Sequence, residues 1–233
     1  MLSQGIETLK QQNHWLLLLD KWNYILYYRD HHLNKHIFRG NILEVGCGRR
    51  GWLSLLLKSH FSVKVTTTDI DPQKVRDARN IAENLGVLSD EYRTADCVCL
   101  PFHDESFDMI VGNAVMHHVL PSIDNAACEF QRVLTHGGQG IFTGEIAGSR
   151  FACWLMRKTT LRKTKDEYVA TCRTWVKAFE KAGFKDIQVM KEKRFGYNKS
   201  VLRDLYYLVL SRMPRYICLS LFASSCTITF KKY

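Results

Sequence analysis

Residues 41–52 read NILEVGCGRRGW, and this stretch decides the fold of the chain. A short apolar run at residues 41–45 leads without a linker into a glycine-rich turn at residues 46–51, after which leucines recur at helical spacing. The pattern predicts a strand, a turn and a helix. Glycines at such a turn permit positive φ and let a ligand approach the backbone, while the start of the helix offers unpaired N–H groups. We therefore expect a nucleotide-like ligand at this turn.

The rest of the chain alternates predicted strands with predicted helices. We expect strands at residues 63–69, 92–95, 109–113, 140–143, 184–190 and 226–231, helices at residues 72–85, 122–134, 166–182 and 200–213, and a turn at residues 136–138. Helical periodicity from about residue 6 to residue 36, with no glycine or proline at residues 7–39, predicts one or two helices before the first strand. Alternation of this kind favours βαβ units in a parallel sheet, which place ligands at the carboxyl ends of the strands.

Length and composition suit one folded α/β domain. The chain has 233 residues, of which 46% are hydrophobic and 24% charged, and its net charge of +10 fits anionic partners such as nucleic acid, acidic lipid head groups or an acidic small substrate, or simply a well-solvated surface. The eight cysteines show no metal-ligand spacing, so we expect free thiols in a reducing cytosol and no metal. We expect a cytoplasmic protein without signal peptide or membrane span, since the apolar region at residues 201–222 carries charges and fits an interfacial, peripheral role instead.

Three acidic residues at predicted strand ends bear on which nucleotide binds. The spacing of glycines 46, 48 and 51 also fits a dinucleotide fingerprint, and Asp69 could serve as its ribose-binding acid. Glu44, however, stands two residues before the first glycine, where it repels a pyrophosphate but suits a ligand with an ammonium and a sulfonium. Asp96 adds a third acid. A ring of carboxylates on successive strand ends fits a cationic cofactor with ribose hydroxyls and an amino-bearing base.

At these residues the sequence resembles the class I S-adenosylmethionine-dependent methyltransferases, particularly the branch with many small-molecule methyltransferases. The blocks that carry the resemblance are ILEVGCGRRG at 42–51, TDIDP at 68–72, ADCVCLPF at 95–102 with SFD at 106–108, MIVGNAVMHHV at 109–119 and RVLTHGGQGI at 132–141. The resemblance covers roughly residues 40–146. It implies a Rossmann-like three-layer α/β sandwich with a seven-stranded, mostly parallel sheet whose last strand is antiparallel. We expect an N-terminal helical cap at residues 1–39 and one methyltransferase domain at residues 40–233.

The resemblance also implies a role for each residue of the cofactor site. Glu44 would lie near the methionine amino group of S-adenosylmethionine, with Gly46, Cys47 and Gly48 passing against the methionine moiety, and Asp69 would accept hydrogen bonds from the two ribose hydroxyls. At the adenine, Ile70 would pack on the face of the base, Asp96 would accept from the amino group, and Cys97 would supply nearby backbone. Asn113 would contact the methionine end through its backbone. The family usually has its third glycine one residue earlier. Here Arg49 and Arg50 intervene before Gly51.

Methyl transfer from a sulfonium is an in-line displacement with a good leaving group, so a close and aligned nucleophile accounts for much of the catalysis. A base is needed only where the acceptor must lose a proton. His117 and His118, just past the fourth strand, are the candidates for that role, and Glu145 ranks below them.

The sequence contains few signals that identify the methyl acceptor. We expect a small or lipid-like molecule. A methyltransferase acting on RNA or protein is the rival, although residues 113–116 read NAVM rather than an Asn-Pro-Pro-Tyr-type motif for base methylation. A non-catalytic partner subunit that keeps the cofactor fold is the third alternative. The oligomeric state stays open.

Overall fold

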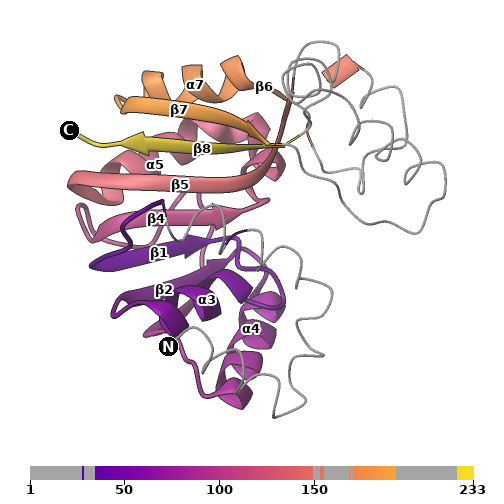
Figure 1. The fold of residues 1–233 in the computed structure, drawn as a ribbon, viewed down its shortest axis with the longest axis vertical. Helices are drawn as coiled ribbons and strands as arrows, with labels where there is room; N and C mark the ends of the chain where they lie inside the picture. The colour runs from indigo at the N-terminus through magenta and orange to yellow at the C-terminus, as the bar shows by residue number, and fades with distance from the viewer. Residues whose placement is uncertain (1–27, 29–34, 149–152, 155–167, 169, 193–224) are drawn as a thin grey trace.

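A computed structural model describes residues 28, 35–148, 153–154, 168, 170–192 and 225–233 of the chain. The expected N-terminal helical cap and the expected helix at residues 200–213 lie almost entirely outside these residues, so both stay predictions. Within the described residues the architecture is a sheet with helices on both faces, drawn in Figure 1.

Seven strands form the sheet in the order β3-β2-β1-β4-β5-β8-β7. Their bounds are β1 Asn41–Val45, β2 Lys64–Asp69, β3 Glu91–Thr94, β4 Phe107–Asn113, β5 Leu134–Gly148, β7 Lys185–Glu192 and β8 Ser225–Lys231, and a two-residue strand, β6 Ala170–Thr171, pairs with the end of β5. Strands β1 to β5 pair in parallel, whereas β8 is antiparallel to both β5 and β7. The predicted Rossmann-like α/β fold with an antiparallel last strand is therefore confirmed.

Alternating side chains of the strands divide the core between the two faces of the sheet. Leu43 belongs to a cluster with α5 (Ile123–Val133) and α7 (Cys172–Lys181), whereas its neighbour Ile42 belongs to a cluster with α3 (Trp52–His60) and the end of α4 (Pro72–Leu85). Successive residues of a strand point to opposite faces, so each apolar strand supplies both clusters. Figure 1 shows α3 in front of the sheet and α5 behind it.

Helix α4 has the bounds that the sequence predicts, because both of its ends carry strong local signals. Asp71 precedes Pro72 and its carboxylate accepts a hydrogen bond from the Gln73 N–H at 2.8 Å, which caps the first turn. Gly86 ends the helix with a φ of +65°.

Two other boundaries differ from prediction. The expected turn at residues 136–138 is part of β5, because Gly137 N–H donates to the Lys232 carbonyl and Lys232 N–H donates to the Gly138 carbonyl, both at 2.9 Å. Lys232, which directly follows β8, therefore pairs with the segment that the sequence predicts to be a turn. The helix expected from residue 166 begins only at Cys172, because Ala170 and Thr171 pair with the end of β5 instead.

Replacing Gly140 by alanine should destabilise the fold, because a Cβ atom there would lie 2.1 Å from Cζ of Phe230. That ring cannot yield easily, since the rings of Phe179 and Phe184 pack on it at centroid distances of 4.2 and 4.4 Å. We expect Gly140→Ala to lower the free energy of unfolding by about 1–3 kcal/mol in urea titrations. The same substitution should cost less in a Phe230→Leu background, and unchanged stability of the single variant would contradict this packing.

Candidate functional site

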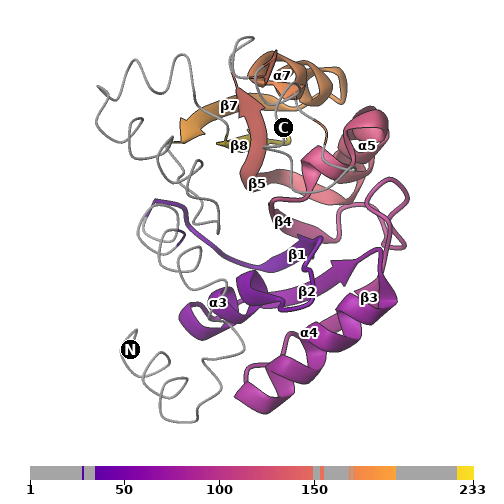
Figure 2. The ribbon, with the colours of Figure 1, turned by 90° about the vertical axis from the view of Figure 1, so that its right-hand side faces the viewer.

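The carboxyl ends of β1, β2 and β4 bring most of the predicted site residues to one edge of the sheet, onto which Figure 2 looks. Cys47 N–H donates to the Thr68 carbonyl at 2.9 Å and so continues the pairing of β1 with β2 into the glycine turn. Gly46 has a φ of +68°, and a Cβ atom on it would lie 2.3 Å from Cγ2 of Val115. Only glycine allows the segment after β4 to come this close to the turn.

Asp69, the last residue of β2, supports the glycine turn with its carboxylate. The side chain is 5% exposed. Its Oδ2 accepts from Gly48 N–H at 2.9 Å and its Oδ1 accepts from Asp71 N–H at 3.0 Å, with Lys74 Nζ at 3.7 Å from Oδ1. Each carboxylate oxygen has a second lone pair, so Asp69 can still accept hydrogen bonds from the hydroxyls of a ligand.

Glu44 is a buried carboxyl at the end of β1 and is 2% exposed. The hydroxyl of Ser54 on α3 donates a hydrogen bond to Oε2 of Glu44. Among the described residues, no cation lies within salt-bridge distance of this carboxyl. Burial raises the pKa of Glu44 to about 7, and the nearby charge of Asp69 adds to that rise. A positively charged ligand group at this point would favour the ionised carboxylate. Sequence reasoning missed Ser54, whose signal is a polar residue among the leucines of α3.

Asp96 and Cys97 follow β3 and lie beside the end of β2, because Ala95 N–H donates to the Asp69 carbonyl at 3.0 Å. The Asp96 carboxylate accepts from Val98 N–H at 3.1 Å and holds a tight turn, while Cys97 packs partly buried against the core. Ile70, directly after Asp69, is 63% exposed and offers an apolar face beside the acids. An exposed isoleucine between acidic strand ends suits a flat, amino-bearing ring.

The segment after β4 is held against the end of β5. Asn113 Nδ2 donates to Thr143 Oγ1 at 2.7 Å, and Ala114, with a φ of +55°, donates its N–H to the Thr143 carbonyl at 2.8 Å. The chain then forms the short 3-10 helices η3 (Met116–His118) and η4 (Leu120–Ser122).

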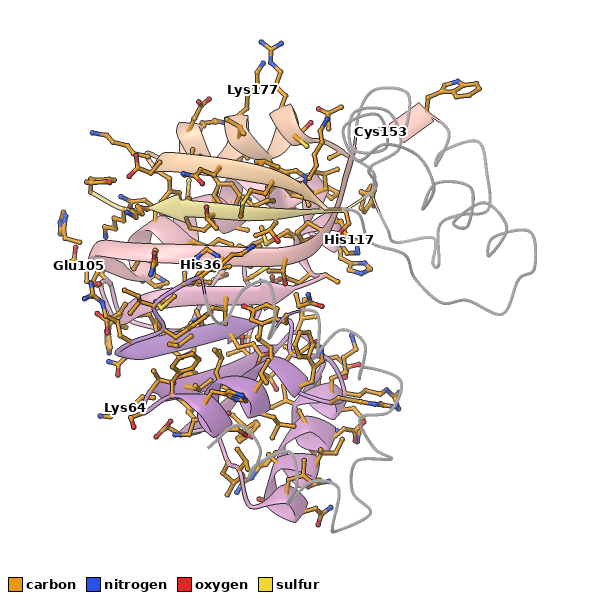
Figure 3. All side chains as sticks on the ribbon, viewed as in Figure 1. His36, Lys64, Glu105, His117, Cys153 and Lys177 are labelled. Carbon is orange, nitrogen blue, oxygen red and sulfur yellow. The ribbon has the colours of Figure 1, made fainter. Side chains whose placement is uncertain are left out.

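His117 and His118 lie in η3 at the carboxyl edge of the sheet, where Figure 3 labels His117. Their ring centroids are 4.4 Å apart, with His117 buried and His118 exposed. His117 contacts the buried carboxylate of Glu145 on β5. Sequence reasoning ranked Glu145 below the histidines, although an acid near the end of an apolar strand was a signal for it.

The two arginines inserted in the glycine turn lie toward the surface. Arg49 is mostly exposed, and its Nη1 lies 3.8 Å from Oδ2 of Asp77 on α4. Gly51 closes the turn as the residue before α3, with a φ of +50°, and its N–H donates to the Cys47 carbonyl at 3.2 Å. The extra residue is therefore accommodated without loss of the strand, turn and helix arrangement.

The described part of the chain shows neither a metal-binding cluster nor a membrane-spanning helix. No cluster of three or more histidine, cysteine, aspartate or glutamate side chains there could hold a metal ion. No helix in the same residues has the length and apolarity to cross a membrane.

Comparisons with known proteins agree on one kind of domain. The family model described as a methyltransferase domain matches residues 43–142. A fatty-acid O-methyltransferase of Mycolicibacterium smegmatis is 32% identical over 102 residues, which are 44% of this chain and 36% of that protein. A phthiotriol/phenolphthiotriol dimycocerosates methyltransferase of Mycobacterium leprae is 32% identical over 97 residues, 42% of this chain and 34% of that one. The matched segment thus spans about a third of each of these relatives.

Solved structures resemble a larger share of the chain. An S-adenosylmethionine-dependent methyltransferase from Methanosarcina mazei aligns with a TM-score of 0.62 at 21% identity, covering 85% of this chain and 95% of that one. At this identity the likeness shows a shared fold.

The buried Glu44 carboxyl should make stability depend on pH. Its pKa is near 7 when folded against 4.5 for an exposed glutamate, so the folded state binds the extra proton between these values. The free energy of unfolding should therefore decrease by about 1–3 kcal/mol as the pH rises from about 4.5 to 7, and it should be constant above that range. The Glu44→Gln variant should not show this decrease in the free energy of unfolding, because glutamine does not titrate. Urea titrations of both proteins from pH 5 to 8 test it, and a constant difference between them would contradict a protonated Glu44.

Proposed function

Residues 43–142 of this chain belong to the class I S-adenosylmethionine-dependent methyltransferase family, and on that premise we propose that the protein transfers a methyl group from S-adenosylmethionine to a small or lipid-like acceptor. The observation that carries the proposal is the buried Glu44 carboxyl, without a cation among the described residues, beside Asp69 at the same sheet edge. A cofactor with an ammonium and a sulfonium supplies the missing positive charge.

The residues at the sheet edge suit the successive parts of this cofactor. Glu44 would accept from the methionine ammonium, and the backbone of Gly46–Gly48, with Cys47 between them, would pass along the methionine moiety. Asp69 would accept from the two ribose hydroxyls, because both of its oxygens already point to the glycine turn and α4 and each keeps a free lone pair.

The adenine end lies one strand further out. Ile70 would pack on a face of the base, and Asp96 would accept from its amino group, with the backbone of Cys97 close by. Asn113 would contact the methionine end through its backbone, since its side chain is used by Thr143. These assignments give the ammonium, the two ribose hydroxyls and the adenine amino group of the cofactor an accepting carboxylate.

Bound S-adenosylmethionine supplies a methyl group on a sulfonium, and the protein has to hold the acceptor in line with it. His117 and His118 follow β4 at the carboxyl edge of the sheet and are the residues that we propose for proton transfer, where the acceptor requires it.

Lipid-like acceptors are supported by the two relatives described above, which are named as methyltransferases of a fatty acid and of phthiotriol dimycocerosates. The net charge of +10 would favour peripheral contact with an acidic membrane surface. The seven cysteines of the described residues form no disulfide with one another, which suits the reducing cytoplasm that we propose for the protein.

Calorimetry should detect binding of S-adenosylmethionine and no comparable binding of NAD. Asp69→Ala should weaken binding roughly 10- to 100-fold, because hydrogen bonds to a charged group contribute about 1.5–3 kcal/mol. Glu83→Gln, which removes an exposed acid near the end of α4, is the matched control and should bind normally. A protein that prefers NAD, or that fails to bind S-adenosylmethionine, would overturn the proposed function.

A further inference from the structure

Glu145 on β5 is a completely buried acid whose carboxylate holds the segment after β4. Its Oε1 accepts from Val115 N–H at 3.0 Å, and its Oε2 accepts from His117 N–H at 3.1 Å. The Nδ1 atom of His117 lies 2.9 Å from the same Oε2. One side chain therefore binds both the backbone and the imidazole of the 3-10 helix η3.

An irregularity in β5 directs this side chain. The register between β5 and β8 shifts between Phe142 and Glu145, and Gly144 within the shift has a φ of +67°. Such bulges change the direction in which the following side chain points, and they are frequent beside active sites. The bulge lies where β5 passes the segment after β4, since Asn113 pairs with Thr143 in the register of the two strands.

The hydrogen bonds determine the tautomer of His117. Both oxygens of Glu145 already accept from backbone N–H groups, and none of the described lysines or arginines forms a salt bridge with this carboxylate. A carboxylate that accepts at both oxygens requires a donor at Nδ1, so the proton of the neutral imidazole is on Nδ1. The lone pair is then on Nε2. This nitrogen has no hydrogen-bond partner among the described residues, and His117 as a whole is 3% exposed.

His117 follows two residues after Val115, which contacts the glycine turn. Val115, bound to the same carboxylate, contacts Gly46 so closely that no other residue fits there. Tyr168, which is 42% exposed, donates its N–H to the His117 carbonyl at 3.1 Å and brings an aromatic side chain to the same edge. The η3 segment thus connects Val115, which contacts the glycine turn, to His117, whose carbonyl binds Tyr168, at the carboxyl edge where Figure 3 labels His117.

We propose that Glu145 positions His117 as a base for a hydroxyl-bearing acceptor, so that the substrate is a lipid-like alcohol or phenol and not a carboxylic acid. This inference rests on the proposed methyl-transfer function. His117 Nε2 accepts the hydroxyl proton while an oxygen lone pair forms the new O–CH3 bond. The C–S bond of the sulfonium breaks, its electron pair stays on sulfur, and S-adenosylhomocysteine leaves. The imidazolium, stabilised by the Glu145 carboxylate, then releases its proton to water.

Methylation of a fatty acid does not need a general base. A carboxyl group with a pKa near 4 to 5 is already ionised at neutral pH, so no base has to take its proton. The negative charge of a carboxylate would also be repelled by the buried Glu145 nearby. A hydroxyl, in contrast, can donate a hydrogen bond to Nε2 before it reacts. The site therefore suits a hydroxyl acceptor, as in the relative named for a triol, better than a carboxylate acceptor, as in the relative named for a fatty acid.

The positioning role can be tested without acceptor or cofactor. In the protein labelled with nitrogen-15 histidine, two-dimensional NMR distinguishes the two imidazole tautomers, and His117→Asn identifies the signals of this residue among the nine histidines. We expect the tautomer with the proton on Nδ1, and we expect Glu145→Gln to lose that preference because an amide offers only one accepting oxygen. A wild-type His117 with its proton on Nε2 would overturn the positioning role.

The substrate class is tested with two probes of equal chain length, para-dodecylphenol and dodecanoic acid in detergent micelles, by formation of S-adenosylhomocysteine. We expect turnover of the phenol, and a loss of roughly 100-fold or more in kcat for His117→Asn and for Glu145→Gln, with the Kd for S-adenosylmethionine retained. Asparagine keeps the hydrogen bond to Glu145 but lacks Nε2, so it separates base catalysis from loop support. Glu145→Asp should restore part of the rate, and His103→Asn on an exposed loop should match wild type.

The two levels of the proposal fail differently. A protein that does not bind S-adenosylmethionine refutes the proposed function itself. A protein that binds it but methylates only dodecanoic acid, or neither probe, refutes the hydroxyl assignment. Full phenol turnover by His117→Asn refutes the base.

Discussion

The parallel pairing of β1 with β2 on one side and β4 on the other is the constraint on which the site depends. Each of these strands runs in the same direction, so their carboxyl ends meet at one edge, where Glu44 on the central strand lies between Asp69 on β2 and Asn113 on β4. The pairing extends beyond the strands, since Cys47 still donates to Thr68 within the glycine turn. The turn therefore continues the hydrogen bonding of the sheet.

Two buried carboxyls at this edge are stabilised in opposite ways. Glu145 is surrounded by N–H donors, which satisfy an ionised carboxylate. Glu44 has a serine hydroxyl and another acid as neighbours, and burial raises its pKa to about 7. One acid thus has donors around it within the fold, whereas the other has no cation within salt-bridge distance among the described residues. This difference underlies the two roles that we propose, in which Glu145 organises the site and Glu44 binds the ligand.

Local signals explain which elements were predictable. Helix α4 was predicted to the residue because its cap, its first proline and its terminal glycine are adjacent in the sequence. The start of α7 and the length of β5 were predicted wrongly, because both depend on partners far away in the chain: Ala170 pairs with β5, and Gly137 pairs with Lys232. No local pattern at Ala170 or Gly137 encodes these partners. Hydrogen bonds between distant strands override local propensity here.

The sequence by itself determined the strand, glycine turn and helix at residues 41–60 and the placement of acids at strand ends, because alternation of apolar strands with helices allows few topologies. It also marked His117 as a residue of interest. Only the tertiary structure decided that Ser54 meets Glu44 and that Glu145 holds His117. A bulge in β5 and the packing of α3 bring these groups together, and such contacts depend on three-dimensional distance, which residue spacing along the chain does not record.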